Sequence, residues 1–206
     1  MSDEQASATG LRQRKKVATR EALARTALLL AAERGLENVR VEDITDAVNV
    51  SRRTFTNYFS SKEEAIASVN AERSARIVDA LRQRPATEPL AASLAEVFAE
   101  QYKEAAALDR RDIERIELVT SSPAVRGEVL KTLVEAELPL AEVIAERTGT
   151  DLQRDLFPRV LAAAVFSAAR AAVGHWRATR GTEPLPALVR QAVIQVTCTS
   201  SAPPAG

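Results

Sequence analysis

The sequence predicts an all-α protein of about nine helices, and three observations favour that fold class. Glycine and proline are scarce, with 7 and 9 among 206 residues, which argues against turn-rich β architecture and against disorder. All nine prolines lie at or after Pro85, so the first 84 residues contain no residue that breaks a helix outright. Hydrophobic residues make up 46% of the chain and recur at three- and four-residue steps, the period of a helix with one buried face.

Caps and turn residues mark the ends of four predicted helices before Pro85. Gly35 suits the end of the first helix, and Asn49 tolerates the positive φ of a tight turn after the second. Ser51 can cap the third helix, and Ser61 with Glu64 forms a capping box for the fourth. These helices are predicted over residues 14–34, 41–48, 52–59 and 62–84.

Five longer helices, rich in alanine and leucine, are predicted beyond the Pro85–Pro89 boundary. Pro139 and Pro158 fall inside two of these patterns, and each predicts a kink or a break that leaves a cavity. Residues 193–199 are rich in β-branched side chains, but they end a helical pattern, so a helix is favoured. The helices are predicted over residues 90–108, 111–120, 123–147, 151–180 and 185–197, and residues 1–10 and 200–206 are predicted to be disordered tails.

The formal net charge is zero, with 28 Lys+Arg against 28 Asp+Glu, but the charge is unevenly distributed. Residues 11–62 hold 11 basic and 6 acidic side chains, which leaves 17 basic and 22 acidic side chains elsewhere. The N-terminal quarter is therefore a cationic module, which suits a polyanionic partner such as nucleic acid.

Several function classes lack the residues that they need. The single cysteine, Cys198, excludes an intramolecular disulfide, and the single histidine, His175, makes a metal site or a His-based catalytic scheme a poor interpretation. Phosphate-binding glycine motifs and G-x-S-x-G are absent. We therefore predict no catalytic residues, no metal site and no cofactor. Residues 1–10 are polar, and the longest largely apolar run, Val160–Ala169, is roughly half of a bilayer span, which predicts a cytoplasmic protein without a membrane span.

Three of the eight aromatic residues, Phe55, Tyr58 and Phe59, fall within the predicted third helix. Phe55 and Phe59 are four residues apart, so they share one helix face and should pack inward. The opposite face would carry two arginines, a threonine and an asparagine. Arginine can pair with guanine and asparagine with adenine, so this face suits the major groove of DNA. Its residues are Arg52, Arg53, Thr56 and Asn57.

Residues 19–69 combine AERG at the end of the first helix with V-x-D-I, V-S-x-x-T-F-x-x-Y-F and S-K-E in the next three. This segment resembles the DNA-binding domain of the TetR family of transcriptional regulators. The resemblance implies an all-α homodimer in which a bound effector alters operator binding. It implies a three-helix helix-turn-helix domain over residues 11–62, a connecting helix over 63–84, and a ligand-binding and dimerisation domain over 85–199.

By this resemblance, the family's DNA-contacting positions are occupied by Arg52, Arg53, Thr54, Thr56, Asn57 and Tyr58, and Lys62 matches a lysine that holds a phosphate. Arg40 stands where many members have Ser or Thr, and it could add a phosphate contact. Asn49, Thr56 and Tyr58 also depart from the common residues at their positions. The segment Arg14, Lys15 and Lys16 resembles the basic arm that some members lay along DNA, and a solvated charged tail is the alternative.

Small residues keep the predicted helix 151–180 thin, which suits close packing against another helix. In TetR-like proteins the last two helices pair with their copies, which implies a homodimer through about 158–197. An Ala-rich helix buried within the monomer is the alternative. An effector pocket is expected between the fourth and eighth helices, where Arg170 either receives an anionic group or extends to the surface. The candidate pocket residues are Phe98, Tyr102, Ile116, Leu133, Leu138, Phe157, Phe166, Arg170 and Trp176.

The sequence thus indicates a ligand-responsive transcriptional regulator rather than an enzyme. As a repressor, it would bind a palindromic operator in double-stranded DNA as a dimer, and a small hydrophobic effector would release it. Two alternatives stay open. One is a ligand or protein adaptor that keeps the fold without binding DNA, and the other is a transcriptional activator.

Overall fold

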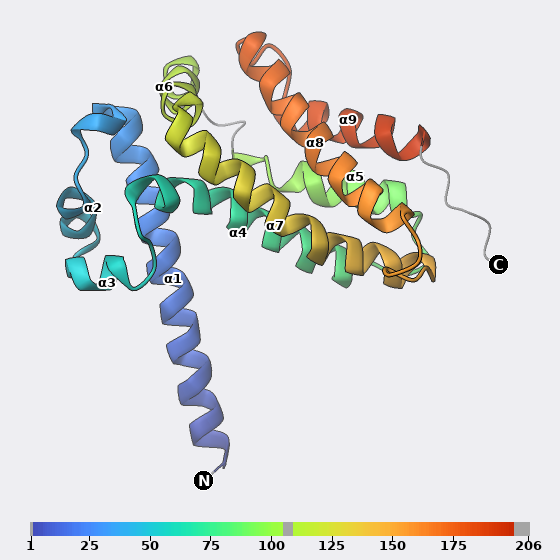
Figure 1. Cartoon of the computed structure of the whole chain (residues 1–206), viewed down its shortest axis with the longest axis horizontal. Coiled ribbons are helices and arrows are strands. Elements are labelled where there is room, and N and C mark those ends of the chain that lie inside the picture. The colour runs from blue at the N-terminus through green and yellow to red at the C-terminus, as the bar shows by residue number, and fades with distance from the viewer. Residues whose placement is uncertain (1, 105–108, 200–206) are drawn as a thin grey trace. The chain divides into compact units, whose positions relative to one another are not determined.

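The computed structural model describes residues 2–104 and 109–199, with the side chains of residues 14–104, 109 and 111–198. Within these ranges every regular element is helical, which confirms the predicted all-α class (Figure 1). The elements are α1 (Ser2–Arg34), the 3-10 helix η1 (Leu36–Asn38), α2 (Val41–Val48), α3 (Arg52–Thr56), α4 (Lys62–Gln83), α5 (Leu90–Glu100), α6 (Arg110–Ser121), α7 (Pro123–Thr148), α8 (Phe157–Ala178) and α9 (Leu185–Thr199).

The chain divides into two compact units, each with its own hydrophobic core. Unit 1 comprises the residues up to Val69 together with Arg115–Val129, and unit 2 comprises Asn70–Glu114 with the residues from Leu130 on. The division falls inside helices α4, α6 and α7, and the domain boundary expected near Pro85–Pro89 stays a prediction. The first two turns of α4 belong to unit 1 because their apolar side chains are buried in its core.

Unit 1 packs α1, α2, α3 and the start of α4 around one core. Leu23 of α1, Ile44 of α2 and Phe55 of α3 are at most 1% exposed and lie in the same cluster. Val125, near the start of α7, is also fully buried there. Gly35 follows α1 with a positive φ of 86°, a backbone conformation that glycine adopts readily, which agrees with its predicted place at the end of the helix.

In unit 2, α9 packs against both α5 and α8 (Figure 1). Phe98 of α5 is fully buried, and its ring meets that of Phe166 of α8 edge to face, with centroids 5.3 Å apart. Helix α8 is the one described helix that is long and apolar enough to cross a membrane by length and composition. Its inward face, which includes Phe166 and Trp176, is buried in the core of unit 2. This burial is the behaviour of a core helix.

A half-buried arginine ties the end of α4 to the start of α5. The guanidinium of Arg147 donates to the carbonyl oxygens of Arg84, Pro85 and Glu88 at 3.1, 3.2 and 3.0 Å, and to Oγ of Ser93 at 3.0 Å. Glu88 also forms an ion pair with Arg84, and this hydrogen bond lowers the pKa of the Glu88 carboxyl to about 2. The linker between α4 and α5 is therefore held by charged hydrogen bonds.

Four predicted helix ends, those at the start of α1, the end of α3, the end of α5 and the start of α8, were wrong by three residues or more. Helix α1 begins at Ser2, within the predicted disordered tail, because no proline interrupts the segment. Helix α3 ends at Thr56 rather than residue 59, where the chain tightens into a turn. Helix α8 begins at Phe157 rather than residue 151, because Asp155 Oδ2 accepts a hydrogen bond from the N–H of Asp151 at 2.6 Å and holds a turn.

The two prolines that were predicted to interrupt helices differ in their positions. Pro158 lies in the first turn of α8, where proline is tolerated, rather than in the interior of the helix. Pro139 does lie inside α7, which continues through it. Helix α5 ends at Glu100 rather than residue 108, and the N–H of Gln101 closes it by donating to the carbonyl of Phe98 at 3.2 Å. Residues 105–108 and the predicted tail at 200–206 lie outside the described residues.

Candidate nucleic-acid interface and effector pocket

The turn between α2 and α3 is fixed by backbone geometry and by a side-chain cap. Asn49 ends α2 in the left-handed region with a φ of 55°, as predicted. The N–H of Val50 then donates to the carbonyl of Thr45 at 3.0 Å. Ser51 caps α3, since its Oγ accepts a hydrogen bond from the N–H of Thr54 at 3.1 Å. These bonds set the orientation of α3 against α2.

Two phenylalanines anchor α3 from its inner side. Phe55 and Phe59 are each 1% exposed, and their ring centroids lie 5.6 Å apart. The guanidinium carbon of Arg20 lies 5.1 Å from the centroid of Phe59 and covers that ring from α1. Burial of both rings confirms the inward face of α3, and it leaves the opposite face to solvent.

The outward face of α3 carries the side chains that the sequence placed there. Arg52, Arg53, Thr56 and Asn57 are exposed, whereas Thr54 and Tyr58 are half-buried. The hydroxyl of Thr54 lies 2.9 Å from Oγ of Ser51 and thus belongs to the cap. The exposed group combines two guanidinium groups, an amide and a hydroxyl, which are the donors and acceptors that read base edges in a major groove.

Lys62, the predicted phosphate ligand, is engaged inside unit 1. Its Nζ donates to the carbonyl oxygens of Leu36 and Val39 at 2.6 and 2.8 Å. These bonds fasten the start of α4 to the segment that links α1 to α2. An ammonium group has three N–H donors, so one donor of Lys62 is left for a phosphate. The phosphate contact stays a prediction.

The remaining basic residues of the predicted interface are exposed. Arg40 precedes α2 and is exposed, and its backbone N–H donates to Oδ2 of Asp43 at 2.7 Å. Arg14, Lys15 and Lys16 lie on α1, so the predicted basic arm is helical here.

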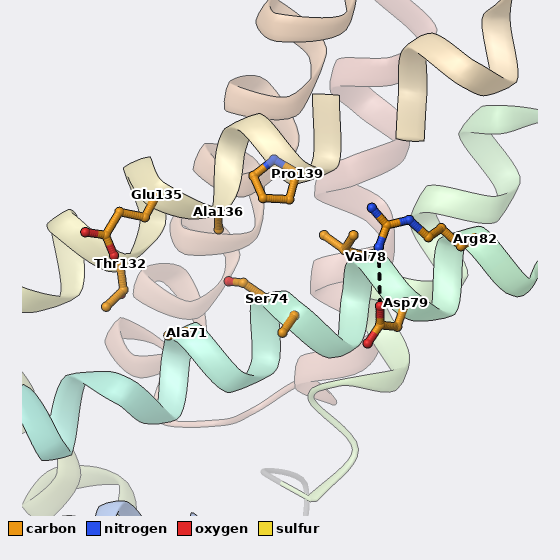
Figure 2. Close-up of a pocket in the computed structure, with 10 residues that line it drawn as sticks. Ala71, Ser74, Val78, Asp79, Arg82, Thr132, Glu135, Ala136 and Pro139 are labelled. Carbon is orange, nitrogen blue, oxygen red and sulfur yellow. Dashed lines mark hydrogen bonds and ion pairs between the residues drawn. The ribbon is translucent and has the colours of Figure 1, made fainter. Parts of the chain in front are cut away.

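A pocket of about 290 Å³ opens between α4 and α7 within unit 2 (Figure 2). Its wall is mostly small and apolar, with the hydroxyl groups of Ser74 and Thr132 among them. At one end, Arg82 Nη1 lies 3.5 Å from Oδ1 of Asp79. Pro139 has no N–H, so the carbonyl of Glu135 lacks its regular helical donor at the pocket wall. The lining residues are Ala71, Ser74, Ala75, Val78, Asp79, Arg82, Thr132, Glu135, Ala136 and Pro139.

The nine residues predicted for an effector pocket lie elsewhere. Phe98, Phe166 and Trp176 are buried in the core of unit 2, and Leu133 and Phe157 pack against it. A further three residues differ in their surroundings: Tyr102 is half-buried beneath the guanidinium of Arg73, Leu138 is 46% exposed, and Arg170 is exposed. Ile116 belongs to unit 1. None of the nine lines the α4–α7 pocket. These nine residues were chosen by helical periodicity, which identifies buried positions. Periodicity does not distinguish a side chain packed in the core from one that lines a cavity.

Comparisons with known proteins agree with this geometry. Residues 23–69, which include α2 and α3, match the family described as bacterial regulatory proteins of the tetR family. Residues 84–199, more than half of the chain, match the MftR C-terminal domain. The chain belongs to the TetR family. It is also similar to the HTH-type transcriptional regulator TcmR of Streptomyces glaucescens, with 35% identity over 179 residues that cover 81% of this chain and 76% of TcmR.

Solved structures of TetR-family regulators share the fold. The fatty acid degradation regulator FadR from Bacillus halodurans matches with a TM-score of 0.58 and 22% identity, over 86% of this chain and 93% of FadR. FadR from Thermus thermophilus, a repressor solved in complex with lauroyl-CoA, matches with a TM-score of 0.53 and 22% identity. The match covers 91% of this chain and 98% of that FadR. The family matches and the similarity to TcmR identify the protein as a TetR-family transcriptional regulator with a helix-turn-helix module.

Proposed function

We propose that the protein is a ligand-responsive, cytoplasmic repressor without enzymatic activity, which binds a palindromic operator as a homodimer. The observation that carries this proposal is the outward face of α3. Arg52, Arg53 and Asn57 are exposed there, while Phe55 and Phe59 anchor the helix from within. A rigid helix that presents guanidinium and amide groups can enter a major groove.

Dimerisation through α8 and α9 is supported by what these helices leave exposed. Much of the alanine in α8 is buried in its own monomer, as at Ala162 and Ala169. A second row of mostly small residues follows steps of four and three along the outer face of α8, and α9 carries an exposed row at the same steps that mixes small and larger side chains. Such rows suit the close approach of helices in a bundle. The rows are Val160, Ala164, Ser167, Ala171, Gly174 and Ala178 on α8, and Ala187, Gln191, Ile194 and Cys198 on α9.

The α4–α7 pocket is the proposed effector site. Its volume is near the lower end of small-molecule sites, and its wall is mainly apolar with a few polar groups. A small, largely apolar effector with one or two hydrogen-bonding groups would fit such a wall. Helices α4 and α7 both continue into unit 1, so a ligand wedged between them would act on helices that also build the core of the DNA-binding unit.

Gel-shift titration tests the proposal with DNA from upstream of the protein's own gene and its neighbours. The wild type should bind one fragment with an affinity that falls steeply with salt, and Arg52→Ala/Arg53→Ala should lose that binding. A matched control, Arg111→Ala/Arg115→Ala, removes two exposed arginines from α6, outside the proposed DNA-binding, dimer and effector surfaces, and should bind normally. Equal binding by wild type and the α3 double variant would refute the assignment of α3, and transcript levels in a deletion strain separate repressor from activator.

A further inference from the structure

The outward-facing guanidinium of Arg52 is held by a carboxylate from the neighbouring helix. Nη1 of Arg52 donates to Oε1 of Glu42, in the first turn of α2, at 2.8 Å. The two side chains are 71% and 52% exposed. An ion pair that is so exposed to solvent contributes little to folding stability. Its effect is therefore to hold the guanidinium of Arg52 in one position.

The pairing leaves most of the donors of Arg52 available. A guanidinium has five N–H donors, and reading a guanine needs two of them in line with the base. The bond to Glu42 uses Nη1, while Nε and Nη2 make no hydrogen bond to the described part of the chain. A side chain held in this way loses less freedom when it meets a base than a freely rotating one.

Glu42 itself sits at a well-defined position. The first turn of α2 is fixed by the bond from the N–H of Arg40 to Asp43, at 2.7 Å. The turn at Asn49 and the Ser51 cap then fix α3 relative to α2. A carboxylate beside Arg52 also repels phosphate groups, which would otherwise attract this guanidinium wherever the protein meets DNA.

We propose that Glu42 is a positioning residue that determines specificity, because it orients Arg52 toward base edges and withholds it from phosphates. The inference rests on the proposed operator binding. It predicts that loss of the carboxylate strengthens binding to unrelated DNA and weakens discrimination at the base pair that Arg52 reads.

The test uses the full-length protein and the duplex that it enriches from a random library. Affinities for that duplex, for each single base-pair substitution of it, and for an unrelated duplex are measured for wild type, Glu42→Gln, Arg52→Ala and the double variant. Arg52→Ala identifies the base pair that depends on Arg52. At that base pair, Glu42→Gln should lose about fivefold or more of the discrimination, with no further loss when it is added to Arg52→Ala.

Two further variants separate orientation from charge. Glu42→Asp keeps the charge on a shorter side chain, so discrimination should fall without stronger binding to the unrelated duplex. Asp46→Asn removes one exposed carboxylate from the other end of α2 and should leave discrimination unchanged. Thermal unfolding followed by circular dichroism verifies that each variant is folded.

Three other outcomes would overturn either this inference alone or the proposed function as well. Wild-type discrimination by Glu42→Gln overturns the inference while the proposed function stands. Lost discrimination at a different base pair, persisting in the Arg52→Ala background, means that Glu42 reads a base itself and also overturns it. A wild-type protein that enriches no duplex refutes the proposed function, and this inference with it.

Discussion

Nζ of Lys62 donates to the carbonyl oxygen of Leu36 at 2.6 Å, and this bond joins the start of α4 to the segment between α1 and α2. A second bond from Nζ to the carbonyl of Val39, at 2.8 Å, strengthens the link. Lys62 therefore has a structural part in unit 1, whatever it does on DNA.

Replacing Lys62 by methionine should destabilise the protein. The change keeps the aliphatic stem but removes two charged hydrogen bonds, and bonds of this kind contribute about 1.5–3 kcal/mol each. We expect the free energy of unfolding in urea to fall by about 2 kcal/mol or more. A variant as stable as wild type would mean that water hydrogen-bonds to the carbonyls of Leu36 and Val39 as well as Lys62 does. If Lys62 also holds a phosphate, the salt dependence of DNA binding should become shallower by about one charge.

The anchoring of α3 predicts a large effect at Phe59. Truncation to alanine leaves a cavity beneath α3, and Phe→Ala in a core costs about 3–5 kcal/mol. Phe59→Leu keeps most of the volume and should cost considerably less. Urea unfolding gives both values. DNA binding of Phe59→Ala should be lost together with its helical signal, and a stable, folded Phe59→Ala that binds DNA normally would contradict the anchoring role.

Local signals explain how much of the interface could be predicted from sequence. The range 41–48 of α2, the left-handed Asn49 and the Ser51 cap were all correct, because each depends on residues within a few positions. The burial of Phe55 and Phe59 followed from their spacing on one helix face.

Interactions between distant segments could not be predicted in this way. Glu42 and Arg52 are ten residues apart, and they meet only because the turn at Asn49 brings α2 and α3 together. The pocket joins Ser74 to Ala136, which the sequence does not connect. Pro139 was the one signal, since a proline inside a helical pattern predicts a nearby cavity, and Pro139 does line the pocket.

The ion pair between Arg84 and Glu88 predicts a pH dependence of stability. The hydrogen bond from Arg84 lowers the pKa of Glu88 from 4.5 to about 2 in the folded protein. The unfolded state therefore binds the proton more readily, and the stabilisation by Glu88 is complete above about pH 4.5 and is lost as the pH falls toward 2. The difference in unfolding free energy between wild type and Glu88→Gln should accordingly shrink across this window.

Urea unfolding at pH 6, 4 and 3 measures that difference. Glu146→Gln, which removes an exposed carboxylate from α7, is the matched control, and its difference from wild type should vary less. A Glu88→Gln difference that stays constant from pH 6 to 3 would mean that the ion pair with Arg84 does not persist in solution.

The α4–α7 pocket predicts that effector response can be removed without loss of DNA binding. Ala75 lines the pocket and is exposed, so phenylalanine at this position can enter the pocket without disrupting the core. Compounds that raise the melting temperature of the wild type are first found in a screen of small apolar molecules, since a ligand that binds the folded state stabilises it. Ala75→Phe should lose this stabilisation, and effector should no longer release it from DNA. Ala92→Phe, at an exposed alanine of α5 outside the pocket, should respond as the wild type does. Full stabilisation of Ala75→Phe by the same compounds would place the effector site elsewhere.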